Sequence, residues 1–534
     1  MSGFAARMMC GVGMATAGIF SPAAAQRLQL VPFADIRQIG QASLSGGNND
    51  NVTYTDVSTG LAAQTNTRRI VASLGYRFSY RIPEAGRGET SVLHNGEGRL
   101  QMQVIKEMLS LDAGVLATQS RVDAGGASPQ FNSIDNRNLT QTYAVYVQPT
   151  TRHHFGEVDV IGSYRYGFVK NEGRDLSPTP APQTNRFDNS RNQMGSLQIG
   201  MGIGELPFEW NLSSQYQRED ASQLDQLYRS YNVALAFKVP VADAFAAVGS
   251  FGYESNEQSS RPVIRDPLTG APVTDSKGRF ATDKTQPRTI SYDQSGLIAD
   301  AGVVWRPSRR TRLEARVGRR YGGLSYSGLL EMQPGDRSTL NVVATDRINS
   351  FGRSITGGLA NAPALLQFSG NDPQSSFQTC LFGLSGNGSC LGGALGQATG
   401  LAYRDRSITA IFSRRMRKLS INVGGGYTRR TYIDDPTQLV SLSGVVDQLF
   451  YLQGSGSLVM ARDSGVSFAF SANMFKNGQV GVGDVVSYST NGSYYRLLGR
   501  GLRAEASLGL ESSKQEGSPA DLLGRAQLGV HYDF

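Results

Sequence analysis

The chain has no long run of apolar residues. A membrane-spanning helix needs about 18 or more of them in succession, and none occurs beyond the first 25 residues. Only 39% of the 534 residues are hydrophobic, and the mean hydropathy is −0.28. A helical membrane protein is therefore excluded. An all-β protein remains, either soluble or a membrane barrel, because a barrel needs apolar residues only at alternate strand positions.

Cysteine is scarce, with three residues in the whole chain. Cys10 lies in the N-terminal apolar segment, so only Cys380 and Cys390 remain in the rest of the chain, in a Gly/Ser-rich stretch. No histidine lies near them to complete a metal site. In an oxidising compartment we therefore expect a disulfide between Cys380 and Cys390 across a small loop.

No Pro-rich or Ser-rich linker divides the chain, although a soluble chain of this length would usually form several domains. Residues 1–25 have the features of a signal peptide: Arg7, an apolar core and an A-x-A site that predicts cleavage after Ala25. An uncleaved inner-membrane anchor is the alternative, but the apolar core is too short to span a bilayer comfortably. We expect residues 26–534 to form one architecture. Export also argues against a nucleic-acid partner, despite the pI of about 9.3.

Recognisable catalytic motifs are missing as well. The four histidines form no H-E-x-x-H zinc motif, and solvated turn positions suit His153 and His154 better than a metal site. The glycines at 424–426 lie inside an expected strand rather than before a helix, and no G-x-S-x-G nucleophile elbow is evident. The sequence therefore predicts no enzyme, with no catalytic, cofactor-binding or metal-ligating residue.

Strand-like alternation is what the sequence does contain, most clearly at its C-terminus. Apolar and polar residues alternate there with a period of two, which places them on opposite faces of a strand. A terminal aromatic strand of this kind resembles the signal by which outer-membrane barrels are recognised for assembly. The edge strand of a soluble sandwich is the alternative. The residues that we assign to the assembly signal are Leu528, Val530, Tyr532 and Phe534.

The same alternation recurs upstream, and its connections alternate between short and long. Barrels place short turns in the periplasm and long loops outside. Tight turns near residues 306–310, 414–417 and 496–500 alternate with long connections such as 256–290 and 349–401. We predict a single large antiparallel transmembrane β-barrel of about 22 strands (20–22), since bacterial single-chain barrels have even counts. Any plug should be a folded-in loop, 349–401 or 256–290.

Arginine dominates the formal net charge of +8. Arginines in the short turns suit either the phosphates of the inner leaflet or an acidic periplasmic partner. Others point toward the lumen by strand parity. They would attract anionic solutes, or they would simply pair with nearby acids such as Glu314, Glu505 and Asp533. The candidate basic lumen comprises Arg312, Arg316, Arg320, Arg404, Arg406, Arg503 and Arg525.

Several stretches resemble a poorly characterised family of exported barrels found with exosortase (PEP-CTERM) and exopolysaccharide gene clusters of Gram-negative bacteria. The stretches are Arg218–Gln226, Asp300–Thr311, Glu314–Gly322, the Cys380/Cys390 loop and Tyr532–Phe534. The resemblance implies an outer-membrane location and a link to surface polysaccharide, but it supplies no active site.

Our first functional hypothesis is an outer-membrane channel or assembly factor for the export or anchoring of surface exopolysaccharide. Its partners would be outer-membrane lipids, the barrel-assembly machinery and components of polysaccharide export. A general diffusion porin is one alternative. A structural or adhesive barrel with partner-binding loops is another, and a soluble periplasmic β-protein is the last.

Overall fold

The computed structural model describes residues 28–45, 51–86, 88–121, 139–172, 187–204, 206–275, 279–366, 380–382, 388–391, 395, 398–435, 441–479 and 481–534. The expected signal peptide, residues 1–25, lies outside these residues. In the described part of the chain, no helix is both long and apolar enough to cross a membrane.

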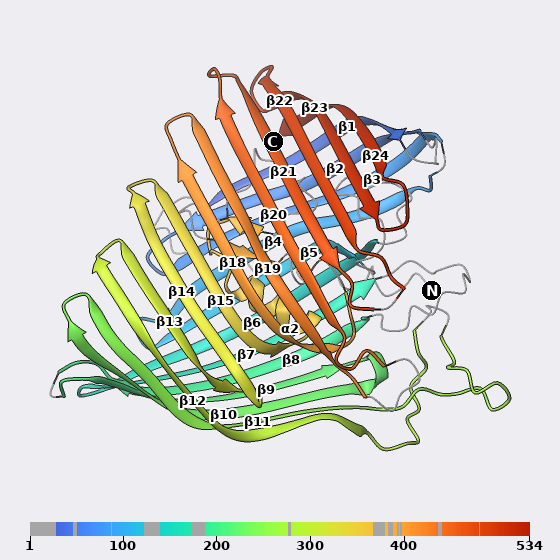
Figure 1. Cartoon of the computed structure of the whole chain (residues 1–534). Coiled ribbons are helices and arrows are strands. Elements are labelled where there is room, and N and C mark those ends of the chain that lie inside the picture. The colour runs from blue at the N-terminus through green and yellow to red at the C-terminus, as the bar shows by residue number, and fades with distance from the viewer. Residues whose placement is uncertain are drawn as a thin grey trace.

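Twenty-two strands form one antiparallel sheet, which confirms the expected fold and strand number. Each strand pairs with its neighbour in the chain, and β1 also pairs with β24, from Phe33 opposite Asp533 to Ser45 opposite Leu522. The last strand therefore closes the sheet into a ring without a free edge (Figure 1). The strands of the first half are β1 (Gln29–Ser45), β2 (Val52–Asn66), β3 (Ile70–Ala85), β4 (Ser91–Ile105), β5 (Leu109–Arg121), β6 (Leu139–Phe155), β7 (Val158–Glu172), β8 (Asn189–Met201), β9 (Glu209–Ala221), β10 (Gln226–Ala242) and β11 (Phe245–Ser260). Those of the second half are β12 (Thr289–Ser308), β13 (Thr311–Arg320), β14 (Gly323–Gly335), β15 (Ser338–Asn349), β18 (Ala402–Arg415), β19 (Leu419–Ile433), β20 (Val446–Val459), β21 (Ser464–Lys476), β22 (Val485–Leu497), β23 (Leu502–Gln515) and β24 (Asp521–Asp533).

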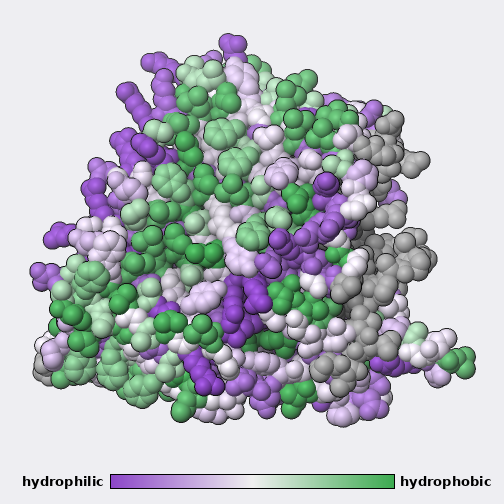
Figure 2. Space-filling model, in the orientation of Figure 1, coloured by the Kyte–Doolittle hydropathy of each residue, from purple (hydrophilic) through white to green (hydrophobic). Residues whose placement is uncertain are grey.

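Side chains alternate between the two faces of the ring, as the sequence period requires. The outward residues Leu528 of β24 and Phe534, directly after its end, are exposed, whereas the inward residues Gln527 and His531 of β24 are buried. Figure 2 shows apolar side chains over much of the upper and left front wall, a hydrophilic patch near its centre, and hydrophilic side chains protruding from the strand tips at the upper left. A closed ring with an apolar exterior is the form in which strands span a bilayer. The chain is an outer-membrane β-barrel.

The connections divide into two kinds. At one end, two to seven residues join consecutive strands, as between β12 and β13 or between β22 and β23. At the other end, most connections are long. The one between β11 and β12 forms an arm with isolated bridges such as Val263 with Thr282, and Leu268 on it is 94% exposed. In Figure 1 this arm projects away from the ring. The short 3-10 helix η1 (Gln223–Asp225) joins β9 to β10.

The connection between β15 and β18 behaves differently. It contains the helix α2 (Phe351–Ala360) and the two-stranded hairpin of β16 (Cys380–Phe382) and β17 (Gly388–Cys390). Figure 1 places α2 inside the ring, between the front and back walls. Of the two loops that we considered as a plug, 349–401 has its described residues inside the ring, whereas the described residues of 256–290 form the projecting arm.

Candidate functional site: a loop that crosses the lumen

The described residues between 350 and 401, here called the lumen loop, touch two opposite walls of the barrel. Helix α2 contacts β5, β6, β7 and β8. The hairpin of β16 and β17 packs against residues of β18, β20, β21 and β22. In ring order β6 is the sixth strand and β19 the seventeenth of 22, so these walls stand half a turn apart. The lumen loop therefore bridges the pore.

A buried ion pair fixes the first turn of α2 to β9. Arg353 Nε lies 2.9 Å from Glu219 Oε2, and both side chains are at least 90% buried. Ser350 begins the helix: its side chain accepts a hydrogen bond from the backbone N–H of Arg353, and its hydroxyl donates to Glu219. The Arg353 guanidinium also lies 3.9 Å from the centre of the Tyr228 ring. Removing either partner of a buried ion pair leaves the other charge buried without compensation, which is strongly destabilising. Glu219, which also accepts the hydrogen bond from Ser350, is therefore the principal polar anchor of α2.

The other end of α2 is held by β4 and β3. Arg99 donates from Nη1 to the carbonyl oxygen of Leu359, at 2.6 Å, where the helix ends and its carbonyl groups lack helical partners. Arg99 is itself oriented by Asp112, 3.1 Å away. Beyond the helix, Ser73 donates to the carbonyl of Ala364 and accepts from the N–H of Leu366.

Apolar contacts complete the attachment of α2. One buried cluster joins helix residues, wall residues and residues near the hairpin, so that α2 rests on a hydrophobic patch inside an otherwise polar lumen. Burial of apolar side chains stabilises such contacts by roughly 1.5–3 kcal/mol for each large side chain. The cluster contains Leu116, Ala144, Tyr146, Val169, Phe187, Phe351, Ile355, Leu359, Ala362, Leu366, Leu381, Leu391, Leu395 and Ala398.

On the opposite wall, Cys380 and Cys390 form a disulfide that closes the base of the hairpin. The disulfide lies directly over Gly424 of β19. A Cβ atom at position 424 would stand 2.8 Å from the sulfur of Cys380 and 3.1 Å from that of Cys390. The wall therefore needs a glycine here, which gives a packing reason for one member of the 424–426 glycine run.

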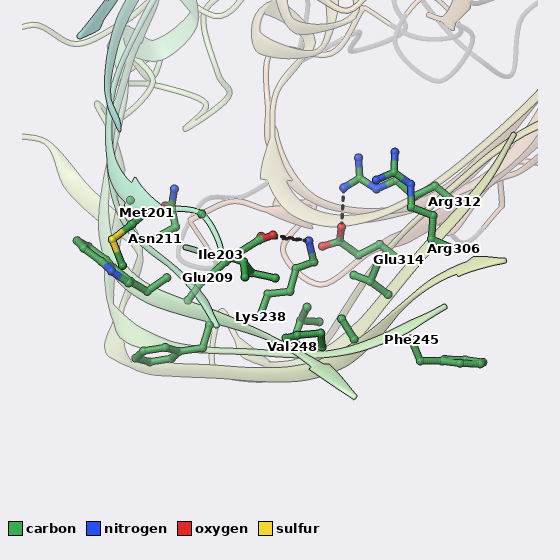
Figure 3. Close-up of a pocket in the computed structure, with 18 of the residues that line it drawn as sticks. Met201, Ile203, Glu209, Asn211, Lys238, Phe245, Val248, Arg306, Arg312 and Glu314 are labelled. Carbon is green, nitrogen blue, oxygen red and sulfur yellow. Dashed lines mark hydrogen bonds and ion pairs between the residues drawn. The ribbon is translucent and has the colours of Figure 1, made fainter. Parts of the chain in front are cut away.

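A cavity of about 620 Å³ opens near the short turns, along the inner wall from β7 to β13. Ala246, Val248 and Val304 form an apolar floor. Two ion pairs stand beside this floor, Lys238 with Glu209 and Arg312 with Glu314, as Figure 3 shows. We call this cavity the vestibule. Its balanced charges and amide side chains suit a neutral polar solute better than a strongly anionic one.

Five of the seven arginines proposed for a basic lumen do face inward. Three are neutralised there: Arg312 by Glu314, Arg316 by Asp300 and Glu314, and Arg320 by Glu254, with N–O distances of 2.8–3.2 Å. Arg503 and Arg525 are partly or wholly buried on the same face. The geometry therefore favours ion-pair ladders over a free positive field in this region.

The assignment of Arg404 and Arg406 to the lumen was wrong. On β18 the inward positions are the odd ones, because Tyr403 bonds to Ser354 of α2 and Ile411 packs beside Cys380. Arg404 and Arg406 share the outer face with Ile408, which is 47% exposed. Charged side chains stand on both faces of this strand near the long-connection end, since Asp405 lies inward and Arg404 and Arg406 outward, so the parity inferred from the sequence was reversed here.

Sequence patterns missed the residues that matter most to the lumen loop. Glu219 and Arg353 are 134 positions apart, and Arg99 and Leu359 are 260 apart. Neither pair belongs to a local motif. The one available signal was strand parity, which places Glu219 on the same face as Glu209 and Asn211. Within the described residues, no group of three or more His, Cys, Asp or Glu side chains could hold a metal ion.

No family model and no curated protein matches the chain. Solved structures are similar at 8–10% identity. The ferric-catecholate import receptor Fiu from E. coli K12, in its open form, has a TM-score of 0.46 and 10% identity over 94% of this chain and 81% of that one. The siderophore receptor PiuA from Acinetobacter baumannii has a TM-score of 0.45 and 8% identity, over 94% and 82%. The copper transporter OprC has a TM-score of 0.41 and 10% identity, over 96% and 82%. We draw no function from likenesses at this level.

Proposed function

We propose that this outer-membrane barrel is a gated channel, closed at rest by its own lumen loop and opened when α2 leaves the β4–β9 wall. One observation carries the proposal: the lumen loop is attached to opposite walls, by the Glu219–Arg353 pair on one side and by the disulfide hairpin on the other. A helix held across the lumen by buried contacts on one wall and by a hairpin on the other obstructs the pore until the contacts on one side are broken.

The substrate class that we propose is a surface exopolysaccharide. The resemblance to barrels associated with exopolysaccharide gene clusters supports this choice. The vestibule supports it too, because paired charges and the amides of Gln198 and Asn211 provide hydrogen bonds without a strong net field. A ring of 22 strands is also wide enough to enclose more than side chains.

Conductance in planar bilayers tests the gate. We expect the purified full-length protein to conduct rarely and in brief events. A variant in which residues 352–399 are replaced by a short Gly-Ser linker should give large, steady conductance. If the unmodified protein conducts steadily at the level of the deletion variant, the barrel is a general diffusion porin and the gate is refuted.

The substrate is tested separately. Deletion of the gene should lower secreted polysaccharide, and the full-length chain supplied from a plasmid should restore it. Unchanged secretion would refute the polysaccharide assignment and leave the gate to be judged by conductance alone.

A further inference from the structure

A row of polar side chains crosses the outer face of the barrel, next to the long-connection end. In the registers of four neighbouring strands, Asp346 lies opposite Arg406, Arg406 opposite Arg429, and Arg429 opposite Gln448. Arg404 stands two positions farther toward the rim on the same face. We call Asp346, Arg404, Arg406 and Arg429 the outer arginine row.

The next outward-facing row, toward the middle of the wall, is apolar. It runs through Ala344, Ile408, Tyr427 and Phe450 in the same registers. The rings of Tyr427 and Phe450 lie 4.6 Å apart, and the Tyr427 hydroxyl donates to Gln448 of the polar row. Aromatic side chains with one polar end mark the boundary between hydrocarbon and headgroups. The outer arginine row therefore lies at headgroup level.

The row is positively charged and held in position. Arg404 binds both oxygens of Asp346, at 2.8 and 2.7 Å, and Arg406 reaches the same carboxylate at 3.3 Å. Both arginines also donate to the carbonyl of Leu324, at 2.9 and 3.0 Å. One carboxylate thus serves two guanidinium groups. Among the described residues Arg429 has no acidic side chain within 4 Å, so two positive charges remain unbalanced.

We propose that the outer arginine row binds the phosphate of an anionic lipid headgroup in the outer leaflet. Guanidinium groups bind phosphate through paired hydrogen bonds, and Asp346 and Leu324 already hold two of them in place. A lipid fits better than a free anion because its acyl chains would cover the apolar row immediately below. A protein partner would have to displace lipid from that row.

The test measures lipid binding to the full-length protein in detergent by native mass spectrometry. The probes are phosphatidic acid, phosphatidylcholine and inorganic phosphate. The unmodified protein should bind phosphatidic acid at least about twentyfold more tightly than phosphatidylcholine. Each arginine near an anionic surface contributes about fivefold to affinity. The double variant Arg406→Gln/Arg429→Gln should therefore lose on the order of twentyfold, and Arg404 remains to balance Asp346.

The matched control is Arg312→Gln/Arg316→Gln, which removes the same charge from the lumen face and should leave lipid binding unchanged. If the double variant does not fold, as judged by the heat-dependent shift in gel mobility, Arg429→Gln alone should still lower the affinity about fivefold. Undiminished binding of phosphatidic acid by the variants overturns the proposal. Equally tight binding of inorganic phosphate also overturns it, because the apolar row would then contribute nothing.

Discussion

At the scale of single residues, the lumen loop depends on Glu219. Replacing Glu219 by alanine would leave Arg353 buried without a counter-charge. Breaking a buried ion pair in this way destabilises the structure that contains it by about 3–5 kcal/mol. Because that cost falls on the attachment of α2 rather than on the barrel wall, we predict that Glu219→Ala raises the frequency of channel opening. Single-channel recording measures it, and hydrogen exchange at residues 350–366 should rise in parallel.

Glu209→Ala is the control for this prediction. Glu209 faces the lumen from the same strand and pairs with Lys238 at 2.9 Å, but both side chains are more than a third exposed. Exposed pairs contribute about 0–1 kcal/mol, so this variant should open no more often than the unmodified protein. Equal opening of the two variants would mean that the Glu219–Arg353 pair does not hold the gate.

The sequence predicted correctly which face of the barrel a residue occupies where apolar and polar residues alternate regularly. It failed for residues near the long-connection end of the barrel. Period-two patterns placed the apolar residues of β24 on the outer face, and the exposed Leu528 and Phe534 lie there. Arg404 and Arg406 were assigned inward by strand parity, but the register of β18 with β15 and β19 places the even positions of this strand on the outer face. A barrel strand crosses from hydrocarbon to headgroups along its length, however, and beyond that boundary both faces accept charge.

At the scale of elements, the disulfide hairpin is the fixed end of the lumen loop. A disulfide that closes a loop of this size lowers the conformational entropy of the hairpin when it is detached from the wall. It thereby stabilises the hairpin packed in the closed channel by about 3 kcal/mol. The double variant Cys380→Ser/Cys390→Ser should therefore loosen the hairpin without unfolding the barrel. We predict faster protease cleavage between residues 380 and 401, with gel mobility of the folded barrel unchanged.

Reduction of the unmodified protein should reproduce the effect of the double serine variant, and reducing agent should have no effect on that variant. Equal cleavage rates with and without the disulfide would show that packing against Gly424 and Ile411 suffices to hold the hairpin.

Strands and turns could be predicted at this scale, but the path of the lumen loop could not. Short and long connections alternate visibly in the sequence, because turns and strands have distinct local chemistry. Two long connections were equal candidates for a plug. Their tertiary contacts distinguish them. Helix α2 binds Glu219 and packs on an apolar patch of the inner wall. The arm between β11 and β12 is instead held at its base by ion pairs of Asp225 with Arg261 and Arg288.

At the scale of the whole molecule, the ring exists only once β24 has paired with β1, and these strands are the last and first of the described chain. The assembly signal that we assign to Leu528, Val530, Tyr532 and Phe534 lies on this closing strand, on its outer face. In the closed ring Tyr532 packs edge-on against Phe534, with ring centres 4.9 Å apart. The same residues could therefore act in recognition before closure or in stability after it.

These two roles can be separated. We predict that Tyr532→Ala/Phe534→Ala lowers the amount of barrel in the outer-membrane fraction severalfold, while refolding of the purified chain into detergent proceeds as for the unmodified protein. The control Leu508→Ala/Leu510→Ala removes two exposed outer-face side chains from the neighbouring strand β23 and should leave the membrane fraction unchanged. A refolding defect in the aromatic variant would instead assign these residues to stability. In that case the terminal aromatics serve the closed ring rather than its recognition.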